Sequence, residues 1–340
     1  EATIAASDLK NIGNATSGAV TVSQAVKITG NAADVTAALV TEASKVTASS
    51  ALVNVTGASI SQYDNIASAT SGTVTYTLSD TAANITTANG AAASKINNAT
   101  TLTVTSGGGA NDLNLSNATT TNLTTITATG DTNIDNVKLS AAVTSSNIAT
   151  IDFVNDNAAD VLILNTADDS NWTTFNANGG VASGSSTFTF NKFNNFDVAA
   201  GEDKLGIFYG GSNATGAFQE ISSTTVASAY RLRDGVVYED SFNSDGDVLT
   251  SAATSATTVM SNVEFIIDAA GSGNATSTGS SGLDFTYILY ARSSSEADAN
   301  SVQSAYVYAG NYTGTGQTAS DNFDRTKLKL TALAEIVGVT

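Results

Sequence analysis

The chain has 340 residues, of which 13 are basic and 31 acidic, so its net charge is −18, and it contains no His, Cys or Pro. Without Cys or His there is no disulfide framework, thiol nucleophile or imidazole base, and zinc sites built from these residues are excluded. The negative charge argues against a nucleic-acid partner, because binding phosphates requires cationic side chains. No run approaches the ~20 apolar residues of a membrane span, so none is expected.

The first part of the chain alternates β-branched segments with Ala-rich ones, a pattern typical of short strands joined by helical turns. Strands are predicted at VTVSQAVKITG (20–30), ALVNVTG (51–57), VTYTLSD (74–80) and TLTVTSG (101–107). Helical turns are predicted at AADVTAAL (32–39) and TAANITTA (81–88).

Similar segments recur with a period of 50 to 54 residues. TSGAVT (16–21) matches TSGTVT (70–75) at an offset of 54, and Ala33–Val35 matches Ala83–Ile85 at an offset of 50. Periods of about 20 to 50 residues indicate a solenoid or array, in which each unit buries its apolar face against its neighbours. Chance similarity between Thr/Ala-rich segments is the alternative.

Aromatic residues divide the chain near residue 150. Of 23 aromatic residues only Tyr63 and Tyr76 precede that point, and residues 1–150 carry nine acids and five bases against 22 and eight afterwards. We therefore expect a mainly β protein with two domains: residues 1–150 as a β-rich, solenoid-like repeat module, and residues 151–340 as an aromatic-cored, β-sandwich-like domain. The predicted aromatic core contains Trp172, Phe188, Phe190, Phe193, Phe196 and Phe208.

The second part contains short apolar segments separated by Gly, Ser, Asn and Asp, as expected for strands and turns. Strands are predicted at 160–165, 186–190, 204–209, 236–239, 263–267, 285–291, 305–309 and 327–332, and a short helix at 294–303.

Acidic turns are the candidate metal sites. Asp112 ends the segment GGGAND (107–112), which approaches the G-G-x-G-x-D calcium repeat, and Asp245 and Asp247 lie in an Asp-rich turn. Asp203 precedes another strand. Oxygen ligands in turns suit calcium, so we expect calcium as the one possible cofactor, while plain turns are the alternative interpretation.

Catalytic patterns are sparse, and we expect no enzyme. Carboxylate pairs such as Glu239 and Asp240 could serve a polysaccharide lyase or epimerase, but a solvated acidic loop explains them more simply. A tyrosine cluster could stack on sugars in an adhesin or glycan-binding module, although alternating tyrosines also suit a packed face. The cluster comprises Tyr287, Tyr290, Tyr306, Tyr308 and Tyr312.

Two segments carry a resemblance to RTX proteins, the bacterial proteins exported by type I secretion. FNKFNNFDVAAGEDKLGIF (190–208) resembles the aromatic strand that follows calcium repeats in that class, and residues 304–340 resemble its C-terminal module. The segments AADVTAALV (32–40) and VTYTLSDTAANI (74–85) are similar to spacer repeats of large S-layer-like surface proteins of cyanobacteria and other marine bacteria. The resemblance implies export without a cleaved leader, a calcium-rich extracellular setting and self-assembly; the tandem calcium array of the class is lacking.

From these patterns we expect an extracellular structural protein that assembles with itself into a cell-surface lattice or filament. The Pro-free strands can pair between subunits, and the low charge density leaves a Thr/Ser/Asn/Ala surface. The expected partner is a second copy of the chain, and cell-surface polysaccharide is a further possible partner.

Overall fold

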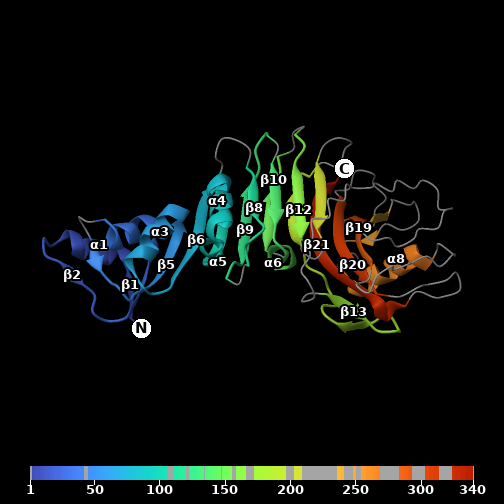
Figure 1. Ribbon diagram of the computed structural model, residues 1–340, viewed down its shortest axis with the longest axis horizontal. Coiled ribbons are helices and arrows are strands. Elements are labelled where there is room, and N and C mark those ends of the chain that lie inside the picture. The colour runs from blue at the N-terminus through green and yellow to red at the C-terminus, as the bar shows by residue number, and fades with distance from the viewer. Residues whose placement is uncertain are drawn as a thin grey trace. The chain divides into compact units, whose positions relative to one another are not determined.

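The computed structural model describes residues 2–41, 45–105, 111–119, 122–133, 135–146, 148–154, 158–165, 172–196, 203–208, 236–240, 248–249, 254–268, 283–292, 303–313 and 324–339. The chain forms two compact units, Glu1–Asp131 and Thr132–Thr340. Both units are rich in strands (Figure 1), so the prediction of a mainly β protein is confirmed.

The first unit is built on a parallel sheet with the strand order β1-β3-β5-β6-β7-β9. These strands are β1 (Ala2–Ala5), β3 (Val26–Asn31), β5 (Leu52–Ala58), β6 (Val74–Thr81), β7 (Ala99–Thr105) and β9 (Thr125–Thr129). Neighbouring strands start 22 to 26 residues apart. Alternate residues of β5 and β6 are buried, as expected for strands with one face in a core.

Helices follow most of these strands directly. They are α1 (Ala6–Asn14), α2 (Ala32–Leu39), α3 (Ile60–Ala69), α4 (Ala82–Ala92) and α5 (Ser94–Asn97). The residues directly before α2, α3 and α4 cap these helices: the side chain of Asn31, Ser59 or Thr81 accepts a hydrogen bond from the backbone N–H three residues on. Such caps satisfy N–H groups that a helix leaves unpaired, which explains how a strand turns into a helix without a long loop.

Short strands complete the unit: β2 (Val20–Thr21) pairs with β4 (Val46–Thr47), and β8 (Leu113–Leu115) contacts α4. Figure 1 shows α1 and α3 on one side of β1 and β5.

Two strand–helix units together span the predicted period. The offset of 50 relates the starts of α2 and α4, and the offset of 54 relates the starts of α1 and α3. The two TSG segments, 16–21 and 70–75, lie in different structural settings. Val20 of the first begins the short strand β2, whereas Val74 of the second begins β6 of the main sheet. Gly72 also packs closely, since a Cβ there would lie 2.1 Å from the Ala51 carbonyl oxygen, while a Cβ at Gly18 would meet only Thr16 Oγ1, at 3.5 Å.

The second unit is built on a mixed sheet. Its order is β11-β15-β21-β20-β19-β17, parallel from β11 to β21, antiparallel from β21 to β19, and parallel again between β19 and β17. These strands are β11 (Ala149–Asp152), β15 (Asn191–Asn194), β17 (Val236–Asp240), β19 (Leu283–Arg292), β20 (Gln303–Tyr312) and β21 (Leu328–Val339). The hairpin strands β13 (Thr173–Phe175) and β14 (Val181–Ser183) join through β21, and β18 (Val248–Leu249) pairs with β19. A 3-10 turn (Arg325–Lys327) leads into β21.

A smaller parallel sheet in the same unit has the order β10-β12-β16. Its strands are β10 (Asn136–Leu139), β12 (Val161–Asn165) and β16 (Lys204–Phe208), and helix α6 (Ala141–Ser146) follows β10.

The predicted aromatic core of the second unit is present in part, and a helix packs into it. Phe188, Phe190, Phe193 and Phe196 are buried and Trp172 is half-buried, while the side chain of Phe208 lies outside the described ones. The helix α8 (Ala256–Asp268) contributes Val259, Met260 and Val263 to a cluster that includes Phe188 and Phe190. A β-sandwich would cover this core with a second sheet; among the described residues, helix α8 packs against it instead.

Two strand predictions are wrong. Residues 263–267 lie inside α8, because the apolar side chains of this segment continue a helical spacing that starts at Val259. Residues 186–190 make only an isolated bridge at Thr187, and the strand β15 begins at Asn191. The helix predicted at 294–303 lies almost wholly outside the described residues.

Candidate functional site

The predicted calcium residues belong to different places in the fold. Asp112 is exposed before β8, and its backbone carbonyl accepts a hydrogen bond from Thr86 Oγ1 at 2.8 Å. Asp203 is half-buried before β16 in the second unit. Asp245 and Asp247 lie outside the described residues, as do residues 107–110. Within the part of the chain that the structure describes, no three acidic side chains gather as a group that could hold a metal ion.

Asp203 is instead one of three aspartates that link the strands of the small sheet. Asp135, Asp160 and Asp203 directly precede β10, β12 and β16, and the register places Val161 opposite both Asn136 and Lys204. The Asp135 N–H donates to Asp160 Oδ1 at 2.8 Å, and the Asp160 N–H donates to Asp203 Oδ1 at 2.9 Å. The carboxylates of Asp160 and Asp203 therefore each satisfy the backbone N–H of the aspartate that precedes the neighbouring strand, which is a structural role.

The sequence contains a pattern for this aspartate ladder, formed by Asp135, Asp160 and Asp203, which the calcium motifs did not reveal. An Asp stands two residues before the first buried apolar residue of each strand of the small sheet, in Asp135-Asn-Val137, Asp160-Val-Leu162 and Asp203-Lys-Leu205. Asn111-Asp-Leu113 in the first unit has the same spacing, and Asn111 is buried as well. A buried polar residue at a fixed place in each turn is what strand-to-strand hydrogen bonding requires.

The two aromatic residues of the first unit form a second cluster. The rings of Tyr63 (α3) and Tyr76 (β6) stack with centroids 4.4 Å apart. Tyr76 Oη donates to the Lys95 carbonyl at 2.8 Å, and Asn98 Nδ2 donates to Tyr63 Oη at 2.7 Å. Burial of the phenol raises the pKa of Tyr76, so this side chain stays a neutral hydrogen-bond donor.

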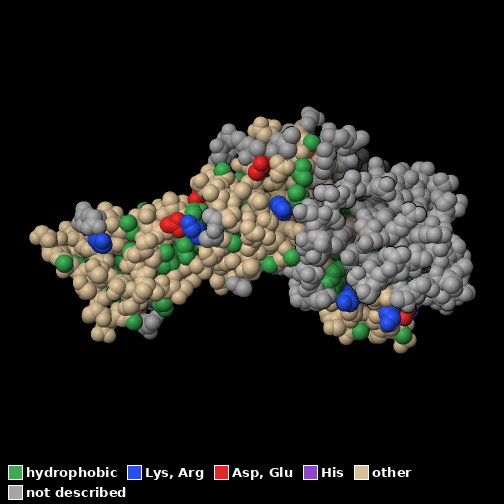
Figure 2. Space-filling view, in the orientation of Figure 1, with side chains coloured by type: hydrophobic (Ala, Val, Ile, Leu, Met, Phe, Trp, Pro, Cys, Tyr) green, Lys and Arg blue, Asp and Glu red, His purple; other side chains and the backbone are tan. Residues whose placement is uncertain are grey.

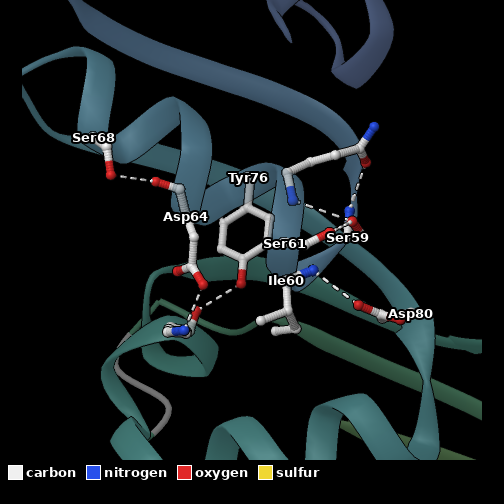
Figure 3. A network of polar contacts seen from close by, with 9 residues as sticks. Ser59, Ile60, Ser61, Asp64, Ser68, Tyr76 and Asp80 are labelled. Carbon is white, nitrogen blue, oxygen red and sulfur yellow. Dashed lines mark hydrogen bonds and ion pairs between the residues drawn. The ribbon is translucent and has the colours of Figure 1, made fainter. Parts of the chain in front are cut away.

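Charged groups around this pair are engaged with one another or with backbone (Figure 3). Lys95 Nζ lies 2.6 Å from Asp64 Oδ2, and the Asp80 carboxylate accepts from the Ile60 N–H at 2.9 Å. Ser59 caps α3 in a reciprocal pair with Gln62. The network joins α3, β6 and α5, because its polar groups pair with one another or with the backbone of these elements.

Four of the five predicted tyrosines line the core of the second unit, while Tyr290 lies outside the residues whose side chains the structure describes. Tyr287, Tyr306, Tyr308 and Tyr312 are each no more than 3% exposed. Phe190 meets Tyr306 and Tyr308 edge-on, with ring centroids 5.1 and 5.5 Å apart. These four rings are therefore not available to stack on a sugar.

Among the described residues, the sheet of the first unit ends at β1. Strand β1 pairs with β3, and no described strand lies on its other side. Ala2 is exposed and Ile4 half-buried, whereas their partners on β3, Val26 and Ile28, are buried. The unpaired edge of a strand is a template for pairing with another chain, and β1 carries no Pro or charged residue that would block it.

The helix that follows β1 adds an apolar side chain to this end. Ile12 of α1 is 50% exposed, more than any other large hydrophobic residue that the structure describes. Figure 2 shows few charged side chains on the visible face of the first unit. Strand edge and exposed apolar residue together make this end the best candidate for an interaction surface.

Comparison of the chain with protein-family models, curated proteins and solved structures found no match. None of the described helices is long and apolar enough to cross a membrane.

Proposed function

We propose that the chain is a structural protein of an extracellular assembly, which associates with itself into a cell-surface lattice or filament. The observation that supports this best is the parallel sheet of repeated strand–helix units, in which each strand pairs with the strand of the next unit. The regular start of strands every 22 to 26 residues favours a solenoid, in which any unit can pack against another of the same kind.

A non-catalytic role belongs to the same proposal. The chain has no His or Cys, and the buried carboxylates of Asp80 and Asp160 already accept backbone hydrogen bonds. Export by type I secretion, a bacterial cell-surface location and weak calcium binding follow from the RTX resemblance and remain part of the proposal. A chain without Cys requires no oxidation after export.

Sedimentation velocity and electron microscopy of the whole chain test the proposal, with and without millimolar calcium. We expect species larger than the monomer whose fraction rises with protein concentration, and regular polymers in micrographs. A chain that stays monomeric at every concentration and in both buffers contradicts the proposal. Turnover of an acidic polysaccharide that one Asp substitution abolishes would point to the enzyme alternative instead.

A further inference from the structure

We propose that the solvent-facing side of the parallel sheet in the first unit binds ice, through a grid of hydroxyl side chains on β6, β7 and β9. The threonine grid consists of Thr77, Ser79, Thr101, Thr103, Thr125 and Thr127. This inference goes beyond the proposed function, because it concerns one face of the sheet and does not require self-assembly.

The register of the sheet arranges the grid in two rows across three strands. The rows are Thr77–Thr101–Thr125 and Ser79–Thr103–Thr127. Leu78, Leu102 and Ile126, which alternate with the grid residues along the strands, are each no more than 1% exposed. The grid therefore lies on the side of the sheet that faces away from the core.

The concentration of threonine on this face is high even for this chain. Ten of the eleven residues that are not buried in β6, β7 and β9 are Thr, and the eleventh is Ser79. Threonine is common on exposed strands because it is β-branched, so strands elsewhere in the chain provide the comparison.

The small sheet of the second unit supplies that comparison. In β10 and β12 the residues that are not buried are Asn136, Lys138, Val161, Ile163 and Asn165. None of them is Thr or Ser, so β propensity and the composition of the chain do not by themselves account for the grid.

The hydroxyl groups of the grid are available to a ligand. Thr77 Oγ1 accepts the Gly57 N–H at 2.6 Å, and the other five hydroxyls make no hydrogen bond to another residue that the structure describes. Because β-branched side chains have few χ1 rotamers, the threonine hydroxyls and methyls are held in fixed positions before a ligand binds. Little side-chain entropy is then lost on binding.

The charge of this face favours an uncharged ligand. The chain has 31 acidic residues, yet the residues of β6, β7 and β9 that are not buried include no acidic or basic side chain. An acidic polysaccharide or a metal ion would find no counter-charge here, whereas ice requires none.

The geometry of a parallel sheet gives the grid two fixed repeats. Neighbouring strands lie about 4.8 Å apart, and alternate residues of one strand lie about 6.6 Å apart, at about 3.3 Å per residue. Water oxygens on a prism face of ice repeat over distances of similar size in two perpendicular directions. The hydroxyls can therefore bond to lattice waters, while the methyl groups restrict the orientation of the water between them. A single sugar chain would use one row of the grid at a time, whereas ice uses both.

Slow growth of ice from a dilute solution of the whole chain tests the proposal, because ice takes up a protein that binds it and excludes one that does not. Thr103→Tyr places a bulky ring in the middle strand of the grid, and the high β propensity of Tyr preserves the strand. Thr47→Tyr is the matched control, since Thr47 is an exposed strand residue of β4, outside the grid. We expect the wild type and Thr47→Tyr in the ice, and Thr103→Tyr in the remaining liquid.

Inhibition of ice recrystallisation provides a second measurement. We expect the wild type and Thr47→Tyr to keep ice crystals small, and Thr103→Tyr to lose this effect. The melting temperature of each variant shows whether it is folded; if Thr103→Tyr melts below the wild type, Thr127→Tyr serves in its place.

The outcomes separate this inference from the proposed function. Exclusion of the wild-type chain from ice overturns the inference, and uptake of Thr103→Tyr at the wild-type level shows that the grid is not the binding face. If the wild type is excluded from ice while Thr103→Tyr weakens retention on dextran or self-association, the face binds that partner and ice binding is wrong. Self-association is measured without ice, so a failure of the proposed function appears in a different experiment.

Discussion

Single polar residues hold the strands of the second unit in register. Asp160 is 2% exposed, and its carboxylate accepts the backbone N–H of Asp135 while its own N–H donates to Asp203. A buried N–H without an acceptor destabilises a fold, so the carboxylate at this position is worth more than a surface charge.

We expect Asp160→Ala to lower the free energy of unfolding by about 1 to 3 kcal/mol, because it leaves the Asp135 N–H without its acceptor. Asp160→Asn is the matched control, since its carbonyl oxygen can still accept that hydrogen bond. Urea unfolding followed by circular dichroism measures both. Equal stability of the alanine variant and the wild type would show that the ladder contributes nothing.

Buried tyrosines make the protein sensitive to alkali. Burial raises the pKa of Tyr76 and of Tyr306, whose hydroxyl also donates to Glu335. The unfolded chain releases these protons near pH 10, while the folded chain retains them. Stability should therefore be complete below about pH 10 and decrease as the pH rises further.

Denaturant unfolding at several pH values above about 9 checks this expectation. Tyr76→Phe should reduce the slope of stability against pH, because one retained proton is removed. Tyrosinate absorbance should appear together with unfolding; a tyrosine spectrum that titrates fully in the folded protein would contradict the prediction.

At the scale of elements, the two copies of the TSG segment differ in how closely their glycine approaches neighbouring backbone. A Cβ at Gly72 would lie 2.1 Å from the Ala51 carbonyl oxygen, and backbone atoms cannot move aside as a flexible side chain can. Gly18, the matching residue of the first copy, has room for a Cβ.

Gly72→Ala should therefore destabilise the protein by about 1 to 3 kcal/mol, because the backbone must shift to admit the methyl group. Gly18→Ala should be neutral or stabilise slightly, since alanine restricts the unfolded chain. Thermal unfolding of the two variants measures the difference, and the opposite order would contradict the packing at Gly72.

At the scale of the whole molecule, charge is unevenly distributed along the chain. Residues 132–340 carry 23 acids and nine bases, so most of the net charge of −18 belongs to that part. Like charges at this density repel one another and destabilise the compact state.

Millimolar calcium should raise the melting temperature more than sodium chloride of equal ionic strength, because divalent cations bind between carboxylates. Differential scanning calorimetry in the two salts makes the comparison. Identical melting curves in the two salts would show that the acidic side chains are only solvated at the surface, and calcium binding would then no longer be part of the proposed function.

Local patterns alone predicted the mainly β fold, the alternation of strands with Ala-rich helices at 32–39 and 81–88, and the aromatic character of the second core. These follow from side-chain spacing and from propensity, which act over a few residues. Local patterns did not assign the segment 263–267, because a short apolar run suits a strand or a buried helix equally well. The helix is the structure in which Val259, Met260 and Val263 pack together into the core.

The exposure of individual side chains depended on tertiary structure. Ile12 and Ile66 occupy the same place in α1 and α3, and nothing in their local sequence makes one exposed and the other buried. Burial at such a position depends on contacts between residues far apart in the chain, which local sequence does not show. In the same way, the sequence predicted Asp203 as a calcium ligand. The register of β12 and β16 instead places its carboxylate where it accepts a hydrogen bond from the Asp160 N–H.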